Sequence, residues 1–294
     1  MAQSLIDHFN EKGFVVAEKL LEVSEIKHYR KVLEGAVRLR KQLDKRKLSE
    51  KSEYEQSFIQ CQNLWEDYPE IRKLTFDQRI AATAAKLLGV NKLRIWHDQA
   101  LVKESGGRET DPHHDQPYWP IKESNTITAW IPLVAISENN GQMGFFPGSH
   151  KIKEAKFINI FKGKVDQQEL QKLPQIEGRE PEYMKLSEGD VSFHHGLTFH
   201  LAKPNNTKED RPVFTVIYFA DGSTRRDDQF HFSVDRASIG VGEIIQSDVT
   251  PLVYPIRKPP RRPRQPISDE FVLPKSLGLL PQDYLLSDSK FEVK

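Results

Sequence analysis

Two histidine-rich stretches constrain this chain more than any other feature. The first is Pro112-His113-His114-Asp115, and the second runs from Phe193 to His200 and holds three histidines. If the first stretch is extended, side chains two residues apart share a face, so His113 and Asp115 point one way and His114 points the other. A downstream histidine from another strand would complete a set of two imidazoles and one carboxylate. The chain is therefore expected to build a metal site.

The choice of the third ligand depends on a predicted hairpin. Residues 189–201 have the pattern of a strand that returns, after a polar turn, as a second strand over residues 212–220. In this pairing His200 lies opposite Arg211, while the other two histidines face apolar positions. A guanidinium offers the bidentate fork that fits a carboxylate. The pattern favours His200 as third ligand and Arg211 as the anchor for a metal-bound dicarboxylate.

Two imidazoles and one carboxylate, with metal positions left open, are the ligand set of non-haem Fe(II) oxygenases. His113-x-Asp115, the later His200 and Arg211 together resemble the phytanoyl-CoA dioxygenase family of Fe(II)/2-oxoglutarate oxygenases. Three further segments resemble that family in the same order: residues 96–103, 128–133 and 140–150. The match extends over roughly residues 5–255, which makes it far more specific than a lone His-x-Asp.

The resemblance implies the cofactors and the reaction. Fe(II) would be held by His113, Asp115 and His200, with 2-oxoglutarate and O2 as cosubstrates and Arg211 on the far carboxylate of 2-oxoglutarate. The implied reaction is hydroxylation of an unactivated C–H bond of a small molecule, with release of succinate and CO2.

The resemblance also suggests roles for residues around the metal. Gln99 and Trp130 are expected to contact 2-oxoglutarate, although an ordinary core tryptophan is an alternative for Trp130. His114 and Tyr118 are expected near the prime substrate. The family usually has glutamine at the position of His114, so this chain departs from the pattern there. His97 and His194 are interpreted as structural, with a supporting role beside the metal as the alternative for His194.

Three rival functions fit parts of the pattern. A halogenase of the same fold would have a small residue where Asp115 stands. A zinc hydrolase using the same ligands would not require Arg211. A catalytically silent, cupin-like metal-binding or regulatory protein is the third alternative, and the complete set of four residues argues against it.

Hydrophobic periodicity predicts a mainly β fold with flanking helices. From residue 92 the period changes from helical to alternating, and short strands separated by Gly, Pro and Asn recur to about residue 221. This pattern suits a double-stranded β-helix, the cupin-like jelly roll, with a site in the mouth between its two sheets. We expect residues 1–294 to form a single domain, with a helical part over 1–91, the jelly-roll core over 92–221, and a C-terminal extension and tail over 222–294.

The helical part is predicted to contain four helices. Expected bounds are residues 3–12, a helix from Glu25 capped by Ser24, residues 54–68, and residues 77–88 stopped by Gly89. Residues 14–16 are expected to form a strand. An insertion over residues 150–185 either borders the substrate pocket or is a solvated connection. The cations of residues 257–264 are expected to be solvated on an extended tail.

Composition excludes some partners. The 43 basic and 42 acidic residues leave a net charge of +1, so no global field recruits nucleic acid or an anionic membrane. No stretch is long and apolar enough to span a bilayer. Cys61 is the single cysteine, which favours a reducing compartment and a cytoplasmic location. The expected partner is a small molecule, bound by a monomer or weak homodimer.

Overall fold

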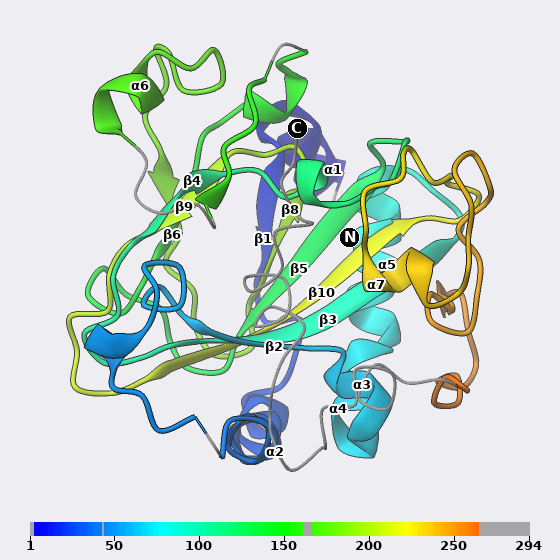
Figure 1. Cartoon of the computed structure of the whole chain (residues 1–294), viewed down its shortest axis with the longest axis horizontal. Helices are drawn as coiled ribbons and strands as arrows, with labels where there is room; N and C mark the ends of the chain where they lie inside the picture. The colour runs from blue at the N-terminus through cyan, green and yellow to red at the C-terminus, as the bar shows by residue number, and fades with distance from the viewer. Residues whose placement is uncertain (1–2, 43, 154, 161–165, 265–294) are drawn as a thin grey trace.

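The computed structural model describes residues 3–42, 44–153, 155–160 and 166–264, and within them it shows two facing β-sheets with helices on one outer side (Figure 1). The strands of the described residues form a seven-stranded sheet, in the order β1-β8-β5-β10-β3-β11 with β2 also paired to β3, and a four-stranded sheet in the order β4-β9-β6-β7. The larger sheet contains β1 (Phe14–Ala17), β2 (Ile59–Gln62), β3 (Leu93–Lys103), β5 (Thr126–Pro132), β8 (Val191–His195), β10 (Arg211–Ala220) and β11 (Leu252–Tyr254). The smaller sheet contains β4 (Thr110–His113), β6 (Met143–Phe145), β7 (Glu182–Tyr183) and β9 (His200–Ala202). The predicted double-stranded β-helix is confirmed.

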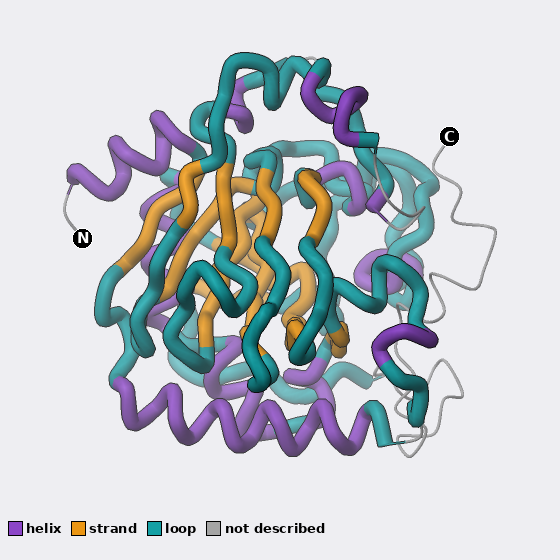
Figure 2. The backbone as a smooth tube through the Cα atoms, turned by 90° about the vertical axis from the view of Figure 1, so that its left-hand side faces the viewer, coloured by secondary structure: helices purple, strands orange, loops and turns teal. Residues whose placement is uncertain are grey.

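The helices cover the outer face of the larger sheet. They are α1 (Gln3–Lys12), α2 (Val23–Arg40), α3 (Leu64–Asp67), α4 (Pro69–Thr75) and α5 (Gln78–Leu88), with α6 (Gln167–Gln171) and α7 (Phe232–Asp235) elsewhere. Figure 2 shows α2 running along the base of the molecule beneath the strands. Alternation along β10 explains the layering, because Phe214 and Val216 join the core under the helices while Val213 faces the smaller sheet.

The predicted hairpin through Arg211 is wrong. Residues 189–201 form two strands in different sheets, because Gly196, Leu197 and Thr198 turn the chain from β8 to β9. β9 pairs with β4 and β6, whereas β10 pairs with β3 and β5. His200 therefore lies opposite His113, and Arg211 lies opposite Lys103. A jelly roll exchanges neighbours in this way because consecutive strands belong to opposite sheets.

The N-terminal part matches the prediction at its ends and differs in the middle. α1, β1 and α5 form as expected, with Asp77 capping α5 and Gly89 ending it at a φ of 66°. The cap of α2 is Glu22 in a capping box with Glu25, so Ser24 lies inside the helix. No helix spans residues 54–68. Instead β2 pairs with β3 along the edge of the larger sheet.

Buried polar bonds hold the start of α3 against the sheet. Asp98 on β3 accepts hydrogen bonds from the backbone N–H groups of Leu64 and Trp65, at 2.7 and 2.9 Å, and from the Thr75 hydroxyl at 2.7 Å. These bonds satisfy backbone donors that a helix leaves free at its first turn. A four-residue helix has little stability of its own, so Asp98 explains why the chain turns into α3 at this point.

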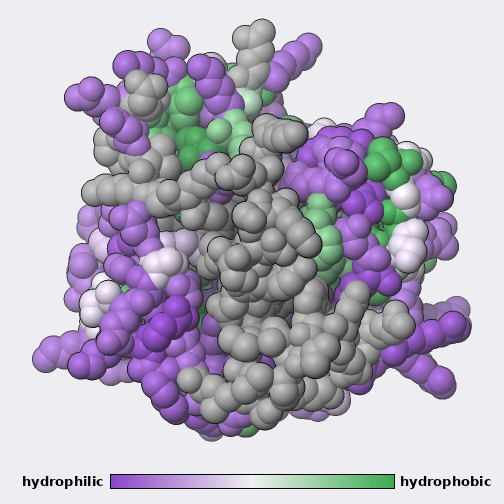
Figure 3. Space-filling view, viewed as in Figure 1, coloured by the Kyte–Doolittle hydropathy of each residue, from purple (hydrophilic) through white to green (hydrophobic). Residues whose placement is uncertain are grey.

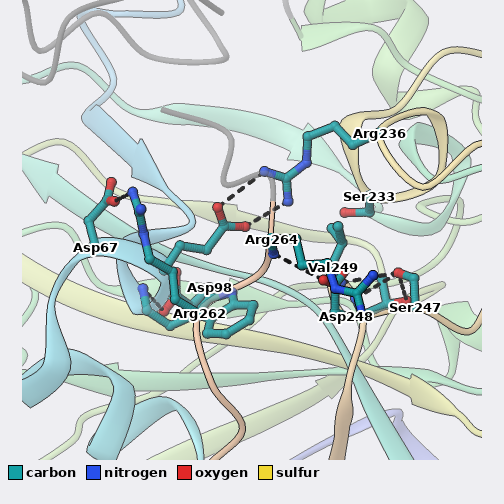
Figure 4. Close-up of polar contacts among 12 residues, drawn as sticks. Asp67, Asp98, Ser233, Arg236, Ser247, Asp248, Val249, Arg262 and Arg264 are labelled. Atoms are coloured by element: carbon teal, nitrogen blue, oxygen red, sulfur yellow. Dashed lines mark hydrogen bonds and ion pairs between the residues drawn. The ribbon is translucent and has the colours of Figure 1, made fainter. Parts of the chain in front are cut away.

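The C-terminal extension is tied to α3 by ion pairs (Figure 4). Arg236, beyond α7, forms a two-pronged bond with Glu66 at 2.7 and 3.1 Å, and both side chains are almost fully buried. Arg262 bonds Asp67 at 2.7 Å, and Pro263 is buried. Part of the segment 257–264 is thus bound to the body, which corrects the expectation that its cations are solvated.

Breaking the Glu66–Arg236 pair is expected to destabilise the fold strongly. Arg236→Ala leaves a buried carboxylate without its guanidinium, which costs about 3–5 kcal/mol of unfolding free energy. Urea denaturation followed by tryptophan fluorescence measures this loss. Arg30→Ala is the matched control, because the Arg30–Glu34 pair is largely exposed and contributes little. Equal, small losses in both variants would show that the buried pair does not anchor the extension.

The surface in view is mainly hydrophilic where it is described, with hydrophobic residues showing at the upper left over the segment that carries α6 (Figure 3). Large apolar side chains that are exposed among the described residues are scattered: Val23, Leu39, Tyr183, Val241 and Ile244. Within the same residues, no helix is both long and apolar enough to cross a bilayer.

Candidate metal centre

Three side chains meet in the mouth between the sheets. His113 is the last residue of β4, His200 is the first residue of β9, and Asp115 precedes the short 3-10 helix Gln116–Tyr118. One ligand atom from each lies within 4.8 Å of the other two. The structure therefore brings together the three residues that the sequence predicted as metal ligands.

The local geometry differs from the strand alternation that predicted it. β4 ends at His113, and Asp115 has helical backbone angles, φ −80° and ψ −40°. Pro117 follows at the start of the 3-10 helix, where its missing N–H is not needed. Asp115 thus reaches the site by a turn after the strand. The extended conformation assumed for residues 113–115 is wrong, although the pairing of His113 with Asp115 holds.

Backbone carbonyls orient both histidines. Nδ1 of His113 lies 2.8 Å from the carbonyl oxygen of Asp111, and Nδ1 of His200 lies 3.0 Å from that of Thr198. Each Nδ1 must carry a proton to donate to a carbonyl, so each Nε2 presents a lone pair. These Nε2 atoms lie 3.7 and 3.9 Å from Oδ1 of Asp115. All three donor atoms therefore face one point.

Electrostatics keeps these groups in the forms that bind a metal. Burial lowers the pKa of His113, and it lowers that of His200 well below its ordinary value, so both imidazoles are neutral at pH 7. Burial alone would raise the pKa of Asp115, but His200 and His194 outweigh it and hold the pKa below its usual range. Neutral imidazoles and an ionised carboxylate are the ligand forms that a divalent metal requires.

Two side chains of the larger sheet hold the other carboxylate oxygen. Oδ2 of Asp115 lies 3.3 Å from the hydroxyl of Thr128 and 3.4 Å from Nε2 of His194. Both residues come from the larger sheet, where they are register partners on β5 and β8. His194 also lies against His200, with ring centroids 4.7 Å apart. The geometry favours the supporting role for His194 that the sequence left as an alternative.

A cavity of about 990 Å³ opens above these ligands. Its lining contains Gln99, Trp130, Tyr118 and Arg211. Four residues that were predicted to lie around the metal therefore border the same cavity as His113, Asp115 and His200. His114 does not belong to this lining. It is buried with its ring edge-on to Phe199, so its predicted contact with substrate has no support in the geometry.

Arg211 is a buried cation without an anionic partner among the described residues. It is 3% exposed, and its Nε and Nη1 atoms have no hydrogen-bond partner there. Its guanidinium lies 5.3 Å from the ring centre of Trp130, and burial lowers its pKa to about 9. A buried guanidinium is costly unless it is paired, so this corner of the cavity is suited to a carboxylate ligand.

Several lining residues were not identified as site residues from sequence. They are Gln60 and Gln62 on β2, His97 on β3, and Gln229, Phe230 and His231 before α7. The alternation of polar Gln60 and Gln62 with Ile59 and Cys61 could have revealed β2 as a strand with a polar face. Nothing in the extension signalled its position over the cavity. Phe157, Asn159 and Ile160 also line it, which favours the reading of segment 150–185 as a pocket border.

Two facing sheets with a His, Asp and His cluster in the mouth between them define the chain as a cupin-like, double-stranded β-helix protein with a candidate metal site. A family model, Phytanoyl-CoA dioxygenase (PhyH), matches residues 9–213, and the chain belongs to this family. The structure is similar to that of SnoK, a non-haem alpha-ketoglutarate-dependent carbocyclase from nogalamycin biosynthesis. That likeness has a TM-score of 0.72 at 25% identity, covering 86% of this chain and 96% of SnoK.

Two curated relatives are matched over a smaller share of their length than SnoK is. A "Probable alpha-ketoglutarate-dependent hypophosphite dioxygenase" of Stutzerimonas stutzeri is 26% identical over 157 residues, which are 52% of this chain and 54% of the relative. The peroxisomal phytanoyl-CoA dioxygenase of Homo sapiens is 26% identical over 231 residues, 70% of this chain and 65% of the relative. The matches thus span between about half and two thirds of the length of these relatives.

Proposed function

We propose that this protein is an Fe(II)/2-oxoglutarate-dependent dioxygenase that hydroxylates an unactivated C–H bond of a small molecule and releases succinate and CO2. One observation carries the proposal: a set of two neutral imidazoles and a carboxylate shares its cavity with Arg211, whose buried guanidinium has donors without a partner among the described residues. The donor set suits Fe(II), and the guanidinium suits the far carboxylate of 2-oxoglutarate (alpha-ketoglutarate). Family membership and the printed activities of the relatives support the same class.

Each residue has a defined task in this proposal. His113, Asp115 and His200 hold the metal through Nε2, Oδ1 and Nε2. Arg211 would bind the C5 carboxylate of 2-oxoglutarate, with its guanidinium over the ring of Trp130, 5.3 Å from the ring centre. Gln99 contacts the cosubstrate from the neighbouring strand. When bound, the iron supplies oxygen activation coupled to oxidative decarboxylation of 2-oxoglutarate.

The remaining walls position substrate and exclude water. The Tyr118 hydroxyl donates to the carbonyl oxygen of Ile158 at 2.8 Å and accepts from the N–H of Ile160 at 3.0 Å. These bonds hold the segment that contains Phe157 over the cavity mouth. The Phe157 ring packs edge-on to the ring of Tyr118 there. Tyr118 therefore acts on the substrate site mainly by holding this wall. A closed, water-poor site strengthens the electrostatic contacts inside it.

Succinate formation tests the function directly. Protein reconstituted with Fe(II) is incubated aerobically with 2-oxoglutarate, ascorbate and candidate substrates, and succinate and product mass are followed. Succinate that depends on both Fe(II) and 2-oxoglutarate, with a product 16 mass units heavier as one added oxygen requires, is the expected result. Hydrolysis supported by Zn(II) without 2-oxoglutarate would favour the zinc hydrolase instead. Metal binding without any turnover would favour the silent binding protein.

We also propose a cytoplasmic location and a monomer or weak homodimer with no nucleic-acid or membrane partner. Cys61 is the single cysteine of the sequence, which rules out a disulfide within the chain, and this and the balanced charge of +1 support the setting.

A further inference from the structure

A second group of polar side chains lines the cavity on the floor formed by β2, β3 and β10. Gln62, Gln99 and Thr215 are successive register partners across these three strands. His97 lies two residues before Gln99 on β3, on the same face. All four border the cavity. Thr215 lies four residues after Arg211 on β10, and His97 lies six residues before Lys103, the register partner of Arg211, on β3. The group therefore extends away from the proposed anchor for 2-oxoglutarate.

Three of these side chains are buried yet have unused hydrogen-bonding atoms. Gln62, His97 and Thr215 are 6%, 3% and 1% exposed, and Oε1, Nδ1 and Oγ1 respectively have no partner among the described residues. The amide nitrogen of Gln62 is already directed at Oε1 of Gln99, 3.5 Å away, which leaves its oxygen as an acceptor. Leaving a buried polar atom without a partner is destabilising. A ligand that bonds these atoms would recover that cost.

None of these groups carries a charge at neutral pH. Glutamine and threonine are neutral, and burial lowers the pKa of His97 to about 4. The neighbouring His231 ring is parallel to His97 within 20°, with centroids 5.9 Å apart. Its Nδ1 accepts from the N–H of Ser233 at 3.1 Å, so Nε2 carries the proton of a neutral ring. This part of the cavity therefore offers donors and acceptors and no ionic contact.

The walls above this floor are aromatic. Besides Trp130 and the histidines, the aromatic side chains that line the cavity are Tyr54, Phe58, Tyr118, Trp119, Phe157 and Phe230. They bury large areas and favour flat or ring-shaped ligands. An apolar body with hydroxyl or carbonyl groups on one side matches aromatic walls and a neutral polar floor.

Charge at the cavity mouth opposes a ligand with phosphates. Apart from Arg211, the Arg or Lys side chain in the described lining is Arg226, and its Nε already bonds Oδ2 of Asp227 at 2.6 Å. Asp228, next to it, is exposed and also belongs to the lining. Phosphate groups are bound by clusters of cations or by free N–H donors. Arg226, which is paired with Asp227 and lies near Asp228, provides neither.

We propose that Gln62, His97 and Thr215 recognise the neutral, oxygen-bearing face of a ring compound, and that the prime substrate is such a compound and not a CoA thioester. Naming this ligand the prime substrate rests on the proposed function. The binding itself depends only on the floor, the aromatic walls and the charge at the mouth.

Binding to the metal-free protein with and without 2-oxoglutarate tests the proposal by calorimetry. The probes are a flavanone, a hydroxycoumarin and an aryl glucoside, each beside its sulfated or carboxylated counterpart, together with decanoyl-CoA. Neutral members are expected to bind, and their charged counterparts and decanoyl-CoA to bind at least about tenfold more weakly, since burying an unpaired charge is costly. Tighter binding of decanoyl-CoA or of the charged members, or no binding of any neutral member, would overturn the proposal.

Isosteric variants locate the site. Thr215→Val and Gln62→Met each remove one polar contact and are expected to weaken the neutral probes about fivefold, the size of one net hydrogen bond. Ser192→Ala is the matched control. It also removes a buried hydroxyl without a partner, on the same sheet, but Ser192 does not line the cavity. Equal effects of the three variants would argue against a binding site on the floor. Circular dichroism checks that each variant is folded.

Titration with 2-oxoglutarate alone separates this inference from the proposed function. If Thr215→Val and Gln62→Met weaken 2-oxoglutarate and leave the neutral probes unchanged, the floor belongs to the cosubstrate and the inference fails. If neutral probes bind as expected but 2-oxoglutarate does not bind even with Fe(II), the proposed function fails and the floor remains a ligand site.

Discussion

Alanine at His113, Asp115 or His200 is expected to abolish succinate formation, with a loss well beyond the 10- to 100-fold that removal of a supporting side chain causes. Each variant deletes one of the three donors that lie within 4.8 Å of one another, and Asp115→Ala also removes the negative charge that balances a divalent cation. His194→Ala is expected to fall in the 10- to 100-fold range, because His194 supports Asp115 and His200 without belonging to the cluster of three donors. Iron content after gel filtration and succinate release together measure these losses.

His195→Ala is the matched control for the histidines. His195 follows His194 on β8 but points to the opposite face, where it lies against Phe9 and His150 and outside the cavity. It should keep most of its iron and activity. Full activity in His200→Ala, or a loss confined to His195→Ala, would show that the third ligand was assigned wrongly.

The grouping of His113, Asp115 and His200 was predictable from sequence, although the predicted hairpin and the extended conformation of residues 113–115 are wrong. His200 was chosen because a hairpin would bring it to Arg211, yet the two residues lie on strands in different sheets. His200 meets His113 through the pairing of β9 with β4. Long-range pairing of this kind depends on the order of strands in the sheets, which local alternation does not encode. The family resemblance indicated the same three residues, which strand periodicity alone could not bring together.

The cavity walls were less predictable because parts of them come from segments that lie far from the three histidine and aspartate residues in the sequence. Residues 54–68 were read as a helix, since a four-residue strand followed by a four-residue helix is too short for a clear period. β2 forms because Ile59 and Cys61 can bury their side chains under the sheet edge while Gln60 and Gln62 face the cavity. His231 reaches the cavity because the buried Glu66–Arg236 pair anchors the chain just after α7. This ion pair joins two residues that are 170 positions apart in the sequence, so it leaves no local sequence pattern.

Arg211→Lys is expected to weaken binding of 2-oxoglutarate about ten- to a hundredfold, which corresponds to the roughly 1.5–3 kcal/mol of a hydrogen bond to a charged group. Lysine keeps the charge but cannot reproduce the two parallel bonds of a guanidinium to a carboxylate. It also loses the position of the guanidinium over the Trp130 ring. Arg211→Ala should lose more, because the far carboxylate would then be buried without any counter-charge. Anaerobic titration of the Fe(II) protein, followed through the charge-transfer absorption of the chelate, measures the affinity.

The location of Arg211 makes this variant specific for the cosubstrate. Arg211 lies on β10, whereas the metal ligands belong to β4, β9 and the turn after β4, so iron content should not change. Arg226→Ala is the matched control, since Arg226 lines the same cavity but is already paired with Asp227. If both Arg211 variants bind 2-oxoglutarate as tightly as the parent protein does, the cosubstrate must be anchored elsewhere and the metal assignment stands alone. If Arg226→Ala weakens 2-oxoglutarate as much as Arg211→Lys, the loss reflects the general charge of the cavity, because a specific anchor would leave the control unaffected.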